Sequence, residues 1–128
     1  MSRLLIIDDD RDTTRLLEMI LARDGHEIKS VNDGSVAMTT AISYQPDIIL
    51  LDLMMPAVDG FEVCRTLRAD SRFKLTPIIL FTAKGDIDTQ MAAFEAGANG
   101  FLQKPVRPQE LRLKINTLVG VVGPKDKR

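Results

Sequence analysis

The chain is poor in the residues that build disulfide frameworks and thiolate or histidine metal sites. Among its 128 residues there is one cysteine, Cys64, and one histidine, His26. A single cysteine forms no internal disulfide and has no partner thiol for a metal site, so we expect a reducing, cytosolic setting. The formal net charge is only -1. This balance gives no reason to expect direct binding of nucleic acid or of an anionic membrane.

Long hydrophobic runs are also missing. The first apolar run, residues 4–7, ends in an acidic triplet after four residues. It is too short for the core of a signal peptide or for the roughly 20 residues of a membrane span, so we expect neither export nor membrane insertion. The length suits one domain with a continuous core. We expect that domain over residues 1–119, with a flexible tail over 120–128 that is either a chain end or the stub of a linker to an output domain.

What the sequence does contain is an alternation of short apolar runs and longer helical patterns. Residues 4–7, 48–51 and 78–81 are continuously apolar, which is typical of strands buried on both faces of a parallel sheet. Residues 26–31 and 100–103 are weaker strand candidates. The intervening segments predict helices over residues 12–24, 35–44, 60–69, 87–96 and 108–119. Five strand-helix units with right-handed crossovers predict an α/β fold, an open doubly wound sheet with helices on both faces.

Carboxylates collect at one edge of this predicted sheet. Asp8, Asp9 and Asp10 follow the first strand, and Asp52 follows the third. In such sheets ligands bind beyond the carboxyl ends of the strands. Two negative charges about 5 Å apart repel by about 3 kcal/mol at an effective dielectric constant of about 20. The sequence therefore predicts a cation at this edge.

The chemistry of the predicted edge favours phosphoryl transfer. Oxygen ligands without histidine or thiolate favour Mg²⁺, or Mn²⁺ in its place, over zinc. An aspartate can also act as a nucleophile towards a phosphoryl group. The Thr82 hydroxyl and the Lys104 ammonium end the fourth and fifth strands, where they can share the phosphoryl oxygens. Asp52 stands apart from the triplet, and we predict that it becomes phosphorylated.

Four motifs in this order resemble the receiver domains of bacterial two-component response regulators, over residues 3–119. The motifs are Ile7-Asp8-Asp9-Asp10, Leu51-Asp52-Leu53-Met54-Met55-Pro56 followed by Asp59-Gly60, Phe81-Thr82-Ala83, and Gly97-Ala98 leading to Phe101, Lys104 and Pro105. The resemblance implies a flavodoxin-like (βα)5 three-layer sandwich with a five-stranded parallel sheet in the order 2-1-3-4-5.

The resemblance also implies a metal site and a phosphoryl donor. Asp52 is then the phosphoacceptor, and the donor is the phosphohistidine of a sensor histidine kinase or a histidine phosphotransfer protein. Asp9 and Asp52 bind Mg²⁺ directly, Asp8 binds it through water, and Met54 contributes its backbone carbonyl.

A further set of implied roles concerns the switch. Lys104 and the backbone of Ala83 bind the phosphoryl group together with Thr82, and the Lys104-Pro105 bond is cis. Thr82 moves towards the phosphoryl group, and Phe101 turns inward. The readout face comprises the helix 87–96, the strand 100–103 and the helix 108–119. It acts on an unidentified downstream protein, with the receiver as a monomer or a phosphorylation-promoted dimer.

Some of these residues also have plainer interpretations. We interpret Asp10 as a helix N-cap rather than a ligand. Met54 and Met55 are expected to be packing side chains, because thioethers prefer soft metals. Cys64 is expected to be a small buried hydrophobe, and His26 is expected to open an edge strand.

Two other functions remain alternatives. Aspartyl-phosphate phosphatases of the haloacid dehalogenase type have a second aspartate two positions after the nucleophile, where this chain has Met54, and their acidic pair comes late in the chain. A receiver-like interaction module without phosphotransfer is the other alternative, although the full set of site residues is present. Without a positioned base, hydrolysis of an acyl phosphate is slow. We therefore expect a signalling switch that phosphorylates itself from a donor with Mg²⁺ and dephosphorylates slowly, not a turnover enzyme.

Overall fold

The centre of the molecule is a five-stranded parallel sheet in the order β2-β1-β3-β6-β7. The computed structural model describes residues 2–122. Since β6 and β7 are the fourth and fifth strands of this sheet along the chain, the predicted order 2-1-3-4-5 is confirmed. The strands of the sheet are β1 (Arg3–Ile7), β2 (Glu27–Val31), β3 (Ile48–Asp52), β6 (Ile78–Thr82) and β7 (Gly100–Gln103).

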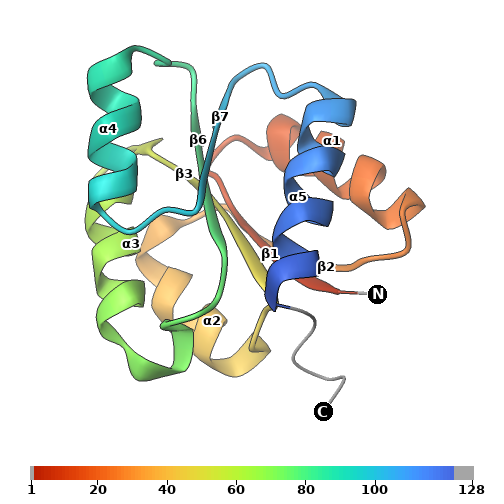
Figure 1. Cartoon of the computed structure of the whole chain (residues 1–128), viewed down its shortest axis with the longest axis horizontal. Helices are drawn as coiled ribbons and strands as arrows, with labels where there is room; N and C mark the ends of the chain where they lie inside the picture. The colour runs from red at the N-terminus through yellow and green to blue at the C-terminus, as the bar shows by residue number, and fades with distance from the viewer. Residues whose placement is uncertain (1, 123–128) are drawn as a thin grey trace.

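Helices cover both faces of the sheet and complete three layers (Figure 1). On one face lie α1 (Arg11–Arg23) and α5 (Pro108–Val122). The opposite face is covered by α2 (Ala37–Tyr44), α3 (Gly60–Ala69) and α4 (Ile87–Glu95). Two short 3-10 helices, Gly34–Val36 and Ser71–Phe73, precede α2 and follow α3. Within residues 2–122, no helix has both the length and the apolar character that a membrane crossing requires.

Alternating side chains of the strands divide the core in two. Leu5 and Leu80 pack with Cys64 of α3 on one face of the sheet. Leu4 and Phe81 pack on the other face, in the cluster that α1 and α5 complete. Because both faces are covered, the central strands are continuously apolar over residues 4–7, 48–51 and 78–81. Cys64 is fully buried, as the sequence predicts.

Besides shifts of one or two residues at the ends of other elements, the structure differs from the predicted fold as follows. The β2 strand begins at Glu27, so His26 precedes it. A short antiparallel hairpin, β4 (Met54–Met55) with β5 (Val58–Asp59), was not expected. Finally, α5 continues to Val122, so the first three residues assigned to the tail are helical. In the sequence, Val122 is followed by Gly123 and Pro124, which are the two residue types that disfavour a helix most. The rest of the expected tail, residues 123–128, lies outside the described residues.

A glycine makes the close approach between α3 and the end of β3 possible. The Gly60 N–H donates to the Leu53 carbonyl at 3.1 Å. A Cβ atom at Gly60 would lie 2.5 Å from the Asp52 carbonyl oxygen and 2.6 Å from the Leu53 Cα. Both neighbours are backbone atoms, which cannot swing aside. The backbone that carries Asp52 therefore requires glycine at this position.

Gly60→Ala is expected to lower the free energy of unfolding by about 1–3 kcal/mol because it forces these backbones apart. Gly100→Ala is the matched control, since a Cβ there would meet its nearest atom, the Ile79 Cγ1, at 3.5 Å. Urea unfolding of both variants measures the difference. Equal stability of the two variants would contradict the assigned close approach.

Candidate functional site

The register of the central strands brings two buried carboxylates together. Ile7 of β1 pairs with Leu51 of β3, so the next residues, Asp8 and Asp52, lie side by side at the carboxyl edge. Each of Asp8, Asp9 and Asp52 offers a carboxylate oxygen, and these oxygens lie within 4.8 Å of one another. Asp8 and Asp52 are only 0% and 2% exposed, whereas Asp9 is exposed. The predicted acidic cluster is therefore present, and two of its members are buried.

Lys104 supplies a positive charge to this cluster. Its Nζ lies 2.9 Å from Asp8 Oδ2 and 3.4 Å from Asp52 Oδ2. The ammonium also lies 5.1 Å from the centre of the Phe81 ring. The Lys104-Pro105 bond that follows is cis, as the resemblance implies. One ammonium is thus shared between two buried carboxylates, so the cluster carries more negative than positive charge.

The donors of the cluster fit a hard divalent cation. Asp8 Oδ1 accepts from the Asp10 N–H at 2.9 Å, and Asp52 Oδ1 accepts from the Met54 N–H at 3.2 Å. Asp8 Oδ2 is buried and has the Lys104 ion pair but no hydrogen bond within the part of the chain that is described. Two buried carboxylates share this one ammonium, and burial makes the remaining negative charge costly unless a further cation binds it. Oxygen donors without histidine or thiolate suit Mg²⁺ or Mn²⁺.

Burial and charge perturb the titration of the two central groups. Burial first, and then the Asp8 charge, raise the pKa of Asp52 to about 7 against the opposing effect of Lys104. For Lys104, burial favours the neutral amine, but pairing with Asp8 and Asp52 outweighs it and raises the pKa of the ammonium. Without a bound cation, Asp52 is therefore partly protonated near neutral pH. A cation beside it favours the ionised, nucleophilic carboxylate.

Thr82 and its neighbours lie at the same edge of the sheet. Thr82 is 1% exposed, and its Oγ1 accepts from the Lys84 N–H at 3.3 Å. Ala83 is exposed, and Phe101 is half-buried against the core on the α2-α3-α4 face. The Thr82 carbonyl accepts from the Lys104 N–H at 2.8 Å, which ties the ends of β6 and β7 together. The structure thus places the hydroxyl at the end of β6 and the ammonium directly after the end of β7, its neighbour in the sheet.

Two residues of this region have roles apart from the cluster. Asp10 is the N-cap of α1, as predicted, because its carboxylate accepts from the Asp12 N–H at 3.0 Å and from the Thr13 hydroxyl at 2.9 Å. These bonds, that from Thr13 foremost, lower the pKa of Asp10. The expectation that Met54 is a packing residue is wrong, because its side chain is 54% exposed, whereas Met55 is buried as expected. The hairpin exposes Met54 because alternate residues of a strand point to opposite sides.

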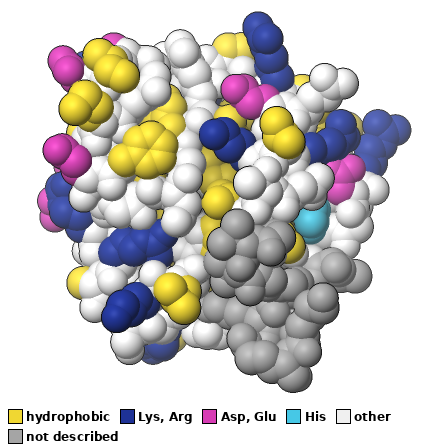
Figure 2. Space-filling view, viewed as in Figure 1, with side chains coloured by type: hydrophobic (Ala, Val, Ile, Leu, Met, Phe, Trp, Pro, Cys, Tyr) yellow, Lys and Arg dark blue, Asp and Glu magenta, His cyan; other side chains and the backbone are white. Residues whose placement is uncertain are grey.

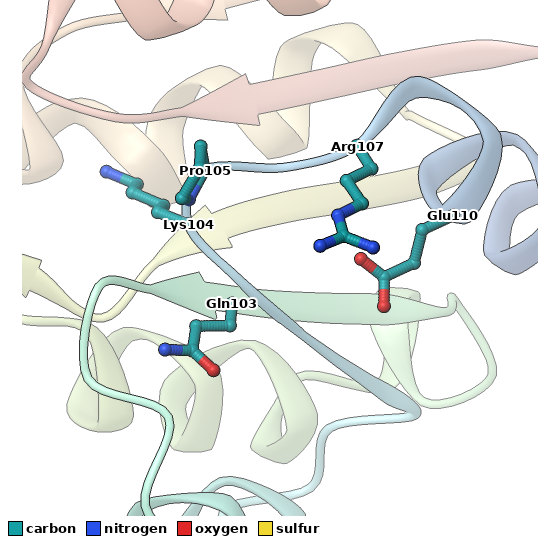
Figure 3. Close-up of a pocket in the computed structure, with 5 residues that line it drawn as sticks. All are labelled: Gln103, Lys104, Pro105, Arg107 and Glu110. Atoms are coloured by element: carbon teal, nitrogen blue, oxygen red, sulfur yellow. The ribbon is translucent and has the colours of Figure 1, made fainter.

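A polar cavity of about 370 Å³ lies beside the segment that connects β7 to α5, next to Lys104. Figure 3 shows the Lys104 side chain pointing away from Arg107 and Glu110. None of the three clustered carboxylates lines this cavity, and Lys104 is the residue that it shares with the acidic cluster. Its lining residues are Gln103, Lys104, Pro105, Arg107 and Glu110.

Sequence reasoning missed one residue that contacts the acidic loop. No role at the site was predicted for Asn32 from the sequence, but its Nδ2 donates to the Asp8 carbonyl at 2.8 Å. Val31 of β2 pairs with Ile7 of β1, so Asn32 follows β2 directly opposite Asp8. The register of this edge strand is the signal that would have located Asn32 at the site.

Comparison with known proteins gives one consistent family. The protein-family model that describes the response regulator receiver domain matches residues 4–116 of this chain. The chain is 39% identical over 119 residues to the DNA-binding dual master transcriptional regulator RpaA of Synechocystis, covering 93% of this chain and 49% of RpaA. It is 40% identical over 118 residues to the transcriptional regulatory protein ResD of Bacillus subtilis, covering 92% of this chain and 48% of ResD. The chain thus spans about half the length of these curated relatives.

A solved structure agrees with the sequence matches. The chemotaxis protein CheY4 of Vibrio cholerae superimposes with a TM-score of 0.87 at 29% identity. The alignment covers 92% of this chain and 98% of CheY4. The similarity therefore extends over nearly the whole receiver fold.

The raised pKa of Asp52 predicts a pH-dependent stability in the absence of divalent cations. The pKa rises from the ordinary carboxyl value of 3.8 to about 7 in the folded protein. Between these values the folded state binds the extra proton, so stability falls as pH rises through this window. Compared with Asp52→Asn, the unchanged protein is expected to lose on the order of 2–4 kcal/mol between pH 4 and pH 8.

Urea unfolding of both proteins in EDTA across this pH range measures the effect. His26 titrates in both proteins, so its contribution cancels in the difference. A difference in stability that stays constant with pH would show that burial does not raise the pKa of Asp52.

Proposed function

The chain belongs to the family of response regulator receiver domains, and we propose that it is a phosphorylation-dependent signalling switch whose phosphoacceptor is Asp52. The observation that carries this proposal is the position of the Asp52 carboxylate. It is grouped with Asp8 and Asp9 within 4.8 Å, and its Oδ2 lies 3.4 Å from the Lys104 ammonium. A nucleophilic carboxylate between a cation site and a fixed positive charge is suited to accept a phosphoryl group.

Asp9 and Asp52 would bind Mg²⁺ directly, Asp8 would bind it through water, and Met54 would contribute its backbone carbonyl. When bound, the ion would supply positive charge that favours the ionised form of Asp52 and offsets the charge of the phosphoryl oxygens. The three clustered carboxylates and their all-oxygen donor set support this assignment, because the Lys104 ammonium is a single charge shared between Asp8 and Asp52. Mn²⁺ has the same preference for oxygen ligands and would substitute.

The phosphoryl donor would be a phosphohistidine of a sensor histidine kinase or a histidine phosphotransfer protein. An Asp52 carboxylate oxygen forms a bond to phosphorus while the phosphorus-nitrogen bond breaks, and the imidazole leaves and takes up a proton. The Lys104 ammonium, the Thr82 hydroxyl and the Ala83 N–H stabilise the equatorial phosphoryl oxygens. The buried ion pairs of Lys104 hold its charge at the site before the donor arrives.

The acyl phosphate would persist long enough to carry a signal. A turnover enzyme would need a base that activates water beside the phosphoryl group. The single histidine, His26, precedes β2 and therefore lies at the amino edge of the sheet, opposite Asp52. The carboxylates nearest Asp52 would be engaged by the cation and by Lys104, so we expect slow autodephosphorylation. The setting proposed for such a switch is cytosolic.

Phosphorylation would be read out on the face formed by α4, β7 and α5. The hydroxyl of Thr82 leaves the Lys84 N–H for the phosphoryl group, and Phe101 turns further into the core. These contacts exist only in the phosphorylated state, so they shift a two-state equilibrium towards it. The exposed side chains of Ile87, Met91 and Phe94 recur on one side of α4, where Figure 2 shows apolar atoms gathered. They offer an apolar surface to a downstream protein or to a second receiver.

With acetyl phosphate and Mg²⁺, the protein is expected to gain the mass of one phosphoryl group, whereas Asp52→Asn gains none. Asp10→Asn is the matched control, because Asp10 caps α1 and asparagine is an equally good N-cap. It is expected to react as the unchanged protein does, and EDTA is expected to stop the reaction of both. Intact-mass spectrometry follows the reaction. Phosphorylation of Asp52→Asn at the normal rate would refute the assignment of the phosphoacceptor.

Thr82→Ala is expected to be phosphorylated on Asp52. The conformational change should reach β7 only weakly, because the hydroxyl that links the phosphoryl group to this strand is missing. The chemical shift changes of Phe101 and α4 amides on phosphorylation should shrink several-fold. Thr39→Ala, on the exposed side of α2, is the control and should retain the full changes. Full-sized changes in Thr82→Ala would mean that the switch does not run through this hydroxyl.

A further inference from the structure

The short loop between β1 and α1 must hold carboxylates that repel one another. It consists of residues 8–10, since β1 ends at Ile7 and α1 begins at Arg11. The Asp8 N–H donates to the Val31 carbonyl at 3.1 Å, and Asp8 Oδ1 accepts from the Asp10 N–H at 2.9 Å. These bonds hold the N–H and the carboxylate of Asp8. The Asp8 carbonyl needs a hydrogen-bond donor from elsewhere.

Asn32 provides that donor and also reaches the helix after the loop. Its Nδ2 donates to the Asp8 carbonyl at 2.8 Å and to the Thr14 Oγ1 at 3.2 Å. Thr14 is buried, and its hydroxyl donates to the Arg11 carbonyl at 3.0 Å. One amide group therefore joins the start of the loop to the first turn of α1. Both ends of the segment that carries the acidic residues are tied to the end of β2.

We propose that Asn32 is a positioning residue that raises the affinity of the acidic site for Mg²⁺. Asn32 is uncharged and bonds the Asp8 backbone rather than a carboxylate, so it acts on the ion through the geometry of the loop. Repulsion among Asp8, Asp9 and Asp52 favours a loop that moves outward when no cation is bound. The Asn32 amide opposes this movement and keeps the carboxylates in place before the ion arrives. The inference rests on the proposed function only in requiring that the site binds Mg²⁺.

Asn32→Ala tests the role of the amide, with Ser30→Ala as the matched control. The Ser30 hydroxyl donates to Glu18 Oε2 at 2.6 Å, so it also links β2 to α1 but does not touch the loop. Mg²⁺ is titrated into each protein, and the amide signals of Asp9 and Asp10 are followed by NMR. Asn32→Ala is expected to bind Mg²⁺ about 10-fold more weakly, and Ser30→Ala within about 2-fold of the unchanged protein. Without Mg²⁺, hydrogen exchange of the Asp10 amide should be faster in Asn32→Ala alone.

Thr14→Val is a second variant that carries the test if Asn32→Ala does not fold. It removes one acceptor of the Asn32 amide and keeps the bond to Asp8, so a weaker loss of Mg²⁺ affinity is expected. Unchanged affinity in the folded Asn32 or Thr14 variant overturns the inference, as does an equal loss in Ser30→Ala. In either case Mg²⁺ binding by the unchanged protein leaves the proposed function intact. No response of the unchanged protein to Mg²⁺ overturns the proposed function together with the inference.

Discussion

The parallel register of β1 and β3 places two carboxylates where each destabilises the other. Ile7 pairs with Leu51, so Asp8 and Asp52 must lie together once the apolar strands pair. Both are buried, and the Lys104 ammonium is the charge that the fold supplies against them. The core on either side of the sheet stabilises this arrangement, because the apolar side chains of the paired strands are buried on both faces. The site is thus a consequence of strand pairing, held at the expense of electrostatic repulsion.

That repulsion connects cation binding to reactivity. Burial and the Asp8 charge keep Asp52 partly protonated near neutral pH, and a protonated carboxyl is a poor nucleophile. A divalent cation that relieves the repulsion also ionises Asp52. The same residues therefore account for metal binding and for activation of the nucleophile. The Lys104 ammonium, which lies 3.4 Å from Asp52 Oδ2, also favours the ionised carboxylate.

The sheet and the residues at the strand ends were predictable because each central strand is visible in the sequence as a continuous apolar run with a polar residue at its end. Continuous apolar runs indicate buried parallel strands, and their carboxyl ends meet at one edge, which brings Asp8, Asp52 and Lys104 together. The β4-β5 hairpin was not predictable, because strands of two residues have no periodicity. Exposure of Met54 follows from that hairpin. Asn32 was missed for a different reason: β2 is a partly exposed edge strand, and its register against β1 cannot be derived from its composition.

Titration of the Asp52 carboxyl carbon by NMR, with and without Mg²⁺, tests the electrostatic account most directly. Without Mg²⁺, the account predicts a midpoint near 7, far above the ordinary carboxyl value of 3.8. Saturation with Mg²⁺ should move this midpoint well below its metal-free position, because the ion favours the ionised form. An ordinary carboxyl midpoint that Mg²⁺ leaves unchanged would contradict the claim that a strained acidic cluster binds the cation and activates Asp52.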